Sequence, residues 1–191
     1  MFSGIIKNLG QFKDKKDSIF TFNVSGEFCK KINKSMSIAV NGVCLTVFKK
    51  TNDSFSIEII PETLDKTTLG NIKFGDMINL ELPLTPQDFL SGHIIQGHVD
   101  TVGLVEKIKA KGNSKILTVK VNTNYSQFIV EKGSIAINGV SFTVISCRQT
   151  QFTIGIIPYT LINTNFKNLK AGDLVNIEVD IIAKYLKRLL K

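Results

Sequence analysis

The stretch SIAVNGVCLTV, Ser37–Val47, decides the fold because a near copy, SIAINGVSFTV, runs from Ser134 to Val144. The two copies lie 134 − 37 = 97 residues apart. The same offset carries Phe55–Leu82 onto Phe152–Val179. The alignment needs no gap from Ser37 to Leu82, and about half of its positions are identical. A period this long exceeds that of a solenoid repeat, so the sequence predicts a duplicated domain.

An Asn-Gly pair divides each copy into two apolar-rich runs, at Asn41-Gly42 and again at Asn138-Gly139. Asn-Gly between such runs is typical of a two-residue hairpin turn of type I′, which needs positive φ at both central residues. After the turn, successive side chains alternate between the two faces of a strand.

One face of that strand is apolar in both copies, with Val43, Leu45 and Val47 in the first and Val140, Phe142 and Val144 in the second. The other face carries Cys44 and Thr46, or Ser141 and Thr143. If the apolar face is the core, each repeat presents one small nucleophilic side chain and one threonine hydroxyl outside. An ordinary solvated strand face is the alternative interpretation.

Short alternating runs with frequent turn signals fill both units, which predicts an all-β fold of small barrels or sandwiches with about six strands each. We expect Met1–Phe12 to be the first strand and His98–Lys107 to open the second unit. Residues 1–90 and 91–180 are the expected domains, joined through the polar stretch Leu84–Gly92. Pro61 follows a strand and is expected to open a short helix or turn.

The last segment, 181–191, reads IIAKYLKRLLK and places apolar residues at helical spacing with lysines between them. A basic amphipathic helix can bind a membrane surface. At this length such a helix more often packs on its own domain or on a subunit partner.

The net charge of +8 permits binding to nucleic acid. The lysines are scattered, however, and aromatic residues do not interleave with them on one strand face. No run of about 18 apolar residues exists that would span a membrane. The first residues have neither a basic start nor a long apolar run, so no signal peptide is expected.

Three cysteines, an odd number, occur without a CxxC spacing: Cys29, Cys44 and Cys147. This indicates reduced thiols in a cytoplasm, with neither a disulfide framework nor a zinc site. Only two histidines occur, His93 and His98, which leaves little room for a metal cluster.

Seven motifs occur in order: MFSGII, VNGVCLTV, PETL…TTLG, GHIIQGHVD, NGVSFTV, IIPYTL and VNIEVD. Together they closely resemble the riboflavin synthase family of the alpha-subunit type, built from two lumazine-binding repeats. The resemblance covers essentially the whole chain. It implies two tandem six-stranded antiparallel Greek-key barrels and a C-terminal helix that gathers a homotrimer.

The resemblance also implies an activity, the last step of riboflavin biosynthesis. Two molecules of 6,7-dimethyl-8-ribityllumazine exchange a four-carbon unit and give riboflavin and 5-amino-6-(D-ribitylamino)uracil. The family needs no metal and no redox cofactor. Its site lies between the N-terminal barrel of one subunit and the C-terminal barrel of a neighbour, and association with a lumazine synthase is a further possible partnership.

The resemblance assigns substrate contacts residue by residue. In the N-terminal barrel these are Gly4, Ile5, Ile6, Cys44, Leu45, Thr46, Glu58, Ile59, Ile60, Pro61, Glu62 and Thr63. In the C-terminal barrel they are Gly97, His98, Val99, Lys132, Ser141, Phe142, Thr143, Gly155, Ile156, Ile157, Pro158, Tyr159 and Thr160. Asp180 matches the family's acidic residue after the last strand, and Phe2 and Ser37 match positions tied to activity.

Each reactive residue has a chemical role and a structural alternative. The C7 methyl group of a lumazine is acidic, and His98 is the natural base for it, unless it is a structural histidine. Cys44 is expected to add to C7 of the acceptor or only to contact its ring, unless it is a packed small hydrophobe. Ser141 would place a hydroxyl or a water on the donor. Asp180 would orient Ser141 or the ribityl chain, or pair with a lysine.

His93 is expected only to cap the linker, and Cys29 and Cys147 are expected to be buried. Two positions depart from the family's usual residues: Asn138 replaces a frequent Asp, and Tyr159 replaces His or Glu.

Two other functions are compatible with parts of the pattern. A non-catalytic lumazine- or flavin-binding accessory protein would keep the repeats but lose Cys44, His93 and His98, which this chain retains. A basic RNA-binding barrel would display aromatic residues for base stacking. Here the face opposite the core holds Cys, Ser and Thr.

Overall fold

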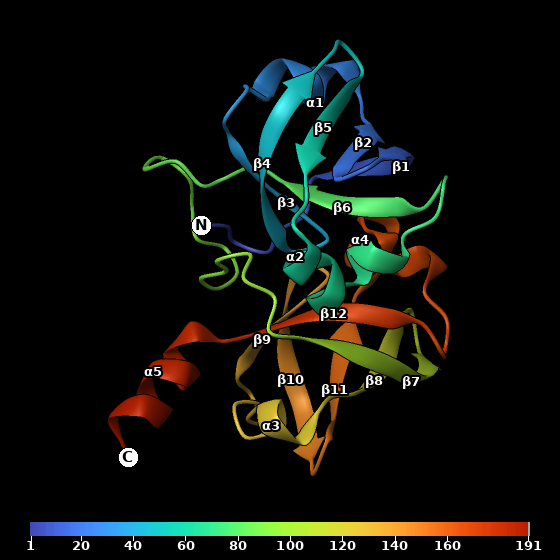
Figure 1. Ribbon diagram of the computed structural model, residues 1–191. Coiled ribbons are helices and arrows are strands. Elements are labelled where there is room, and N and C mark those ends of the chain that lie inside the picture. The colour runs from blue at the N-terminus through green and yellow to red at the C-terminus, as the bar shows by residue number, and fades with distance from the viewer. Residues whose placement is uncertain (191) are drawn as a thin grey trace.

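Both halves of the chain form closed antiparallel barrels of six strands with the same strand order. The computed structural model describes residues 1–190. In Figure 1 the first barrel, blue to green, lies above the second, yellow-green to red. The first barrel consists of β1 (Asn8–Lys16), β2 (Ile19–Asn23), β3 (Ser37–Val40), β4 (Val43–Lys50), β5 (Ser54–Glu58) and β6 (Met77–Glu81). The second consists of β7 (Thr101–Lys111), β8 (Ser114–Lys120), β9 (Ser134–Ile137), β10 (Val140–Arg148), β11 (Gln151–Ile156) and β12 (Leu174–Val179).

The order around the first barrel is β1-β2-β5-β4-β3-β6, and the second repeats it as β7-β8-β11-β10-β9-β12. Strands β3, β4 and β5 follow one another as hairpins while β2 returns to pair with β5, which is a Greek key. The predicted all-β fold of two tandem barrels is therefore confirmed.

Short helices close the barrels and connect their strands. They are α1 (Gly26–Lys31), α2 (Pro61–Lys66) and η1 (Thr68–Asn71) in the first half, and α3 (Thr123–Ser126), α4 (Pro158–Asn163) and η2 (Asn165–Asn168) in the second. Both α2 and α4 begin with a proline, which fits the first turn because its missing N–H has no partner there anyway.

The repeated hairpin has the predicted geometry. Asn41 and Gly42 have φ of 46° and 77°, and Asn138 and Gly139 have φ of 45° and 76°. Positive φ at both positions is what a type I′ turn requires. The apolar face of β4 and of β10 is buried, as the alternation predicted. Each barrel therefore has its own core, with the Cys44 or Ser141 face turned outward.

The two hairpin turns meet where the barrels join. A Cβ atom on Gly42 would come within 2.6 Å of the Gly139 nitrogen, and one on Gly139 within 2.7 Å of the Gly42 nitrogen. Glycine is thus needed here for the backbone angle and for the close approach. The contact is nearly symmetric, as expected of two copies related by a pseudo-twofold axis.

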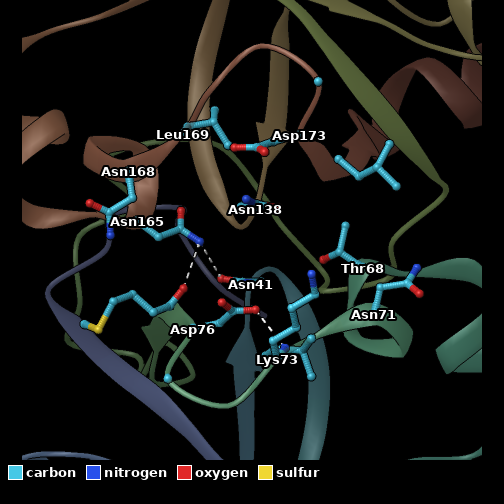
Figure 2. A pocket seen from close by; sticks show the side chains of 15 residues that line it. Asn41, Thr68, Asn71, Lys73, Asp76, Asn138, Asn165, Asn168, Leu169 and Asp173 are labelled. Atoms are coloured by element: carbon cyan, nitrogen blue, oxygen red, sulfur yellow. Dashed lines mark hydrogen bonds between the residues drawn. The ribbon is translucent and has the colours of Figure 1, made fainter.

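Reciprocal asparagine bonds surround this contact. The Asn79 amide Nδ2 donates to the Asn138 carbonyl, and the Asn176 Nδ2 donates to the Asn41 carbonyl, both at 2.9 Å. The side chains of Asn41 and Asn138 accept from the backbone N–H groups of Asn79 and Asn176, both at 2.8 Å. Asn165 adds a bond to the Asn41 side chain at 3.1 Å, drawn in Figure 2. The amides of Asn41, Asn79, Asn138 and Asn176 thus satisfy one another and fix how the barrels face each other, while the Asn165 Oδ1 atom is buried without a hydrogen-bond partner among residues 1–190.

The segments that precede β1 and β7 cross between the barrels, which the sequence did not predict. The expected first strand, Met1–Phe12, is wrong at its start: β1 begins at Asn8, and Phe2 forms an isolated bridge with Ile95. Gly4 and Gly97, with φ of 78° and 80°, turn the chain away from the strand that follows. We call Ser3–Ile6 the first crossing segment and Gln96–Val99 the second.

Each crossing segment contributes to the other barrel. Ile6 is buried in the core of the second barrel, and Val99 packs against the core of the first. The Ser141 N–H donates to the Gly4 carbonyl at 2.9 Å, and the Cys44 N–H donates to the Gly97 carbonyl at 2.8 Å. The sequence analysis assigned Gly4–Ile6 to the N-terminal barrel and Gly97–Val99 to the C-terminal barrel. Both assignments are corrected, because each segment contributes to the other barrel. Each segment touches the opposite reactive strand.

Helix α5 (Ile181–Leu189) confirms the predicted helical tail, and Lys191 lies outside the described residues. Two contacts attach it to the second barrel: Lys184 pairs with Asp100 at 2.6 Å, and the Lys187 ammonium lies 4.9 Å from the Phe128 ring centre. Its large apolar side chains remain exposed, among them Ile182, Tyr185, Leu186 and Leu189. Figure 1 shows the helix projecting beside the second barrel. No helix within residues 1–190 is both long and apolar enough to cross a membrane.

Candidate active site

The first reactive position is Cys44, on the outward face of β4. Its side chain is half-buried, and its backbone N–H is held by the Gly97 carbonyl. A Cβ atom on Gly97 would lie 2.6 Å from the Cys44 Cβ, so the two backbones touch. His98 follows Gly97 and is exposed. The second crossing segment thus places an imidazole one residue from the contact with the thiol-bearing strand.

The corner between β5 and α2 borders Cys44. Val47 pairs with Ile57, so continuing the register places Glu58 beside Thr46. Thr46 is exposed, and Ile60, at the N-cap of α2, is 60% exposed. We call Cys44 and Thr46 of β4, Ile60 and Thr63 at the start of α2, and His98 of the second crossing segment the first patch. It offers hydroxyls, an exposed apolar side chain and a thiol that is half-buried against Phe2, Ala39, Ile95 and Ala136.

The equivalent second patch consists of Ser141, Thr143, Ile157, Thr160 and His93. The Ser141 hydroxyl lies 2.7 Å from His93 Nδ1, which is a hydrogen bond. Ser141 also contacts Gly4, since a Cβ atom there would lie 2.6 Å from the Ser141 Cβ. Ile157 is 57% exposed, like its counterpart in the first patch. The second patch therefore joins a serine to an imidazole within one face.

His93 was predicted only to cap the linker, and that prediction is wrong. It is half-buried, and burial lowers its pKa from the usual 6.5, while the nearby Asp180 carboxylate raises it in part. A neutral imidazole bonded to a hydroxyl can accept the hydroxyl proton. The repeated Gly-His pairs at 92–93 and 97–98 were the sequence signal that pointed to both histidines.

Asp180 lies beside the second patch and begins α5. Its carboxylate accepts the Ile182 N–H at 2.9 Å, which is an N-cap bond. Its charge acts on His93 and favours the protonated imidazole. Asp180 thus contributes to the electrostatics of the Ser141–His93 pair.

Other expected site residues have structural surroundings. Phe2 is fully buried and exchanges two backbone hydrogen bonds with Ile95, at 2.7 and 3.1 Å, which tie the two crossing segments together. Ser37 pairs with Thr46 across β3 and β4. Lys132 is exposed in the turn before β9, with φ of 65°. Cys29 is buried as expected, but Cys147 is exposed, so that expectation is wrong.

The two departures from the family pattern lie in different surroundings. Asn138 belongs to the buried asparagine contacts between the barrels, where its side chain caps the Asn176 N–H. Tyr159 is 63% exposed in the first turn of α4, between Ile157 and Thr160 of the second patch in the sequence. Of the two, only Tyr159 is open to solvent, since Asn138 is buried.

Two buried carboxylates at equivalent positions were missed by the sequence reasoning. Glu81 ends β6 and Glu178 lies in β12, and each accepts backbone N–H groups of a crossing segment. Burial raises the pKa of both carboxyls, and the hydrogen bonds oppose that rise. The sequence did carry a signal for them, since a glutamate recurs at the 97-residue offset within an apolar strand. A buried carboxylate needs hydrogen-bond donors, so such a glutamate indicates a bonded partner segment.

A hollow between the barrels lies away from both patches. Figure 2 shows it between the barrels, lined by Asn41, Asn138 and Asn165 and by the acidic residues Asp76 and Asp173. Neither Cys44 nor Ser141 lines it. The chemistry favours the two open patches, because the reactive side chains and both histidines are there. No group of metal-ligating residues gathers within the part of the chain that the structure describes.

Comparisons with known proteins agree with this architecture. The lumazine binding domain family matches twice, at residues 3–83 and 96–180. Riboflavin synthase of Actinobacillus pleuropneumoniae is 36% identical over 194 residues, covering 100% of this chain and 90% of the relative. Riboflavin synthase of Bacillus subtilis is 35% identical over 194 residues, with the same coverage. That of Schizosaccharomyces pombe is 36% identical over 196 residues, covering 100% of this chain and 94% of the relative.

Solved structures show the same fold. LumP complexed with riboflavin matches with a TM-score of 0.85, and LumP complexed with 6,7-dimethyl-8-(1'-D-ribityl) lumazine with 0.83. Both are 24% identical and cover 94% of this chain and 99% of LumP. With two lumazine-binding domains and full-length relatives of one name, the chain belongs to the riboflavin synthase family of transferases.

Proposed function

We propose that this chain converts two molecules of 6,7-dimethyl-8-ribityllumazine into riboflavin and 5-amino-6-(D-ribitylamino)uracil. The observation that carries the proposal is the pair of equivalent patches that differ at the reactive position, Cys44 in one and Ser141 with His93 in the other. Two similar patches suit two copies of one substrate, and different reactive groups suit a donor and an acceptor. Family membership and the LumP complexes with lumazine support the choice of ligand.

The residues divide the chemistry as follows. A base removes a proton from the acidic C7 methyl group of one lumazine, and the two imidazoles, His98 and His93, are the available bases. The thiol of Cys44 is suited to attack C7 of a lumazine in the first patch, because sulfur is the strongest nucleophile there. The Ser141 hydroxyl, held by His93, is suited to place a hydroxyl or water on a lumazine in the second patch. A four-carbon unit then passes from donor to acceptor.

The reaction needs the two bound lumazines to be in contact. The exposed surfaces of the chain indicate a way to bring them together. Both patches are open, with Ile60 and Ile157 more than half exposed. The apolar residues of α5 are also exposed. We propose a homotrimer in which the first patch of one subunit meets the second patch of the next and α5 contributes to the subunit contact. Facing the patches would set the reacting molecules in proximity.

The decisive experiment is to incubate the purified, chelator-treated protein with 6,7-dimethyl-8-ribityllumazine alone. We expect riboflavin fluorescence to appear, with the uracil product formed in equal amount. Saturable binding of lumazine without turnover would instead identify a non-catalytic accessory protein. Activity lost on chelation and restored by a metal would overturn the expectation that no cofactor is needed.

A further inference from the structure

Two buried carboxylates hold the crossing segments through several hydrogen bonds each. Glu81 accepts the Ser3 N–H at 2.8 Å, the Ser3 hydroxyl at 2.7 Å and the Gly4 N–H at 3.0 Å. Glu178 accepts the Gln96 N–H at 2.7 Å and the Gly97 N–H at 2.9 Å. Both glutamates are less than a tenth exposed, at 7% and 4%. Each carboxylate therefore uses both oxygens to fix a two-residue stretch of backbone.

The other edge of each fixed stretch faces a reactive residue of the opposite barrel. Gly4, held by Glu81 of the first barrel, accepts the Ser141 N–H of the second. Gly97, held by Glu178 of the second barrel, accepts the Cys44 N–H of the first. One peptide segment thus links each glutamate to one reactive residue through hydrogen bonds on both sides.

The crossing segments lie in direct contact with the strands that carry the reactive residues. The glycine positions would place a Cβ atom 2.6 Å from Ser141 Cβ or from Cys44 Cβ, so the backbones are in direct contact. Both glycines hold φ near 80°, a region that other residues rarely adopt. A movement of the segment is therefore transmitted to the reactive side chain.

We propose that the two glutamates are positioning residues that act across the barrels: Glu81 orients the Ser141–His93 pair, and Glu178 orients Cys44. A conventional reading of the repeats would assign each glutamate to the reactive residue of its own barrel. The hydrogen bonds favour the crossed assignment. This inference rests on the proposed function only in naming Cys44 and Ser141 as reactive, so it is tested without substrate.

The test compares Glu81→Gln with Glu178→Gln, each the matched control of the other. A carboxamide keeps the size of the side chain but turns an NH₂ group toward a backbone N–H, so one hydrogen bond is lost. The first readout is the rate of Cys44 alkylation by iodoacetamide, followed peptide by peptide, with exposed Cys147 as the internal reference. The second is the pKa of His93, followed by NMR of the labelled imidazole.

We expect E178Q to change the alkylation rate of Cys44 by about threefold or more while leaving the His93 titration in place. E81Q should shift the His93 titration and leave Cys44 alkylation unchanged. The uncrossed pattern, in which E81Q acts on Cys44 and E178Q on His93, would overturn the proposal. Equal effects of both variants on both readouts, or no effect on either, would also overturn it.

Milder variants cover the case in which a glutamine variant does not fold. Ser3→Ala removes the hydroxyl bond to Glu81 and the bond that this hydroxyl accepts from the Ile5 N–H, both within the first crossing segment or its glutamate, and should move the His93 titration alone. Glu178→Asp keeps the charge but shortens the side chain and should move Cys44 alkylation alone. The same variants are then assayed for lumazine turnover. If the variants show the crossed pattern but the unaltered protein forms no riboflavin, the proposed function is refuted and the positioning role stands.

Discussion

The two patches share a frame but differ in what supports the reactive side chain. In the first, Cys44 is held through its backbone by Gly97, and the neighbouring imidazole, His98, is exposed. In the second, the Ser141 side chain is itself hydrogen-bonded, to the half-buried His93. The two repeats therefore share one backbone arrangement, and the chemical difference between the patches lies in a few side chains.

The difference arises from the linker that precedes the second crossing segment. This linker carries His93 and stands before Gln96. That linker passes Ser141, since a Cβ atom on Gly92 would lie 2.9 Å from the Ser141 hydroxyl. The second patch thus receives residues from both crossing segments and their approaches, Gly4 and His93. The linker thus makes the two patches chemically different, because it brings His93 to Ser141.

The largest expected effect comes from removing α5, which tests whether the two patches compared belong to different subunits in the working enzyme. A chain ending at Asp180 should be monomeric, bind lumazine and lose at least about 10²-fold in turnover, because the reacting molecules are no longer brought together. Sedimentation and a riboflavin fluorescence assay give the two readouts. A fully active monomer would show that one chain contains the complete site.

Cys44→Ser tests whether the chemical difference between the patches matters. We expect lumazine binding to persist while kcat falls by roughly 10²-fold, because a hydroxyl is a far weaker nucleophile than a thiol. Steady-state kinetics separate a fall in kcat from a rise in KM, which would mean ground-state contact only. Ser141→Ala is the matched variant at the 97-residue offset and should have a smaller effect. Wild-type turnover by Cys44→Ser would make Cys44 a packing residue.

Gly42→Ala and Gly139→Ala test the part of the frame that is truly symmetric. Each adds a Cβ atom within 2.7 Å of a backbone nitrogen and forces alanine to a positive φ. We expect both variants to lower the free energy of unfolding by about 2–3 kcal/mol, and by similar amounts. Urea denaturation measures this. A large difference between the two would show that the barrels do not contribute equally to their contact.

The smallest expected effect concerns the Asp180 carboxylate beside the second patch. Asp180→Asn should lower the pKa of His93 further, because the carboxylate raises it now, while asparagine remains a good N-cap for α5.

Burial has already moved this pKa below 6.5, so the unfolded chain binds the proton first as the pH falls. Stability is therefore full above pH 6.5, declines below it, and should decline further in the variant. NMR titration of His93 checks the shift, with Asp76→Asn as the distant control. A rise in the pKa would contradict the electrostatic role.

The sequence predicted the repeated hairpins, an all-β fold, the proline-started helix and the C-terminal helix, because each depends on local periodicity or turn chemistry. The choice of barrels over sandwiches came from the family resemblance. The crossing segments escaped prediction, because Gly4 and Gly97 lie 97 − 4 = 93 residues apart and fall outside the gapless alignment. Periodicity also says nothing about which barrel a segment joins, a choice made by distant contacts such as those of Ile6 and Val99. His93 was underestimated for the same reason, since its partner Ser141 is 48 residues away.

The crossed segments also bear on how the two halves change over evolutionary time. A substitution in Ser3–Ile6 alters contacts of the second barrel, although the segment is encoded with the first repeat, and Gln96–Val99 stands in the reverse relation. Neither half can therefore be exchanged for a homologous half, or drift toward a new ligand, without a matching change in its twin. The two repeats of this chain are therefore expected to change together rather than independently.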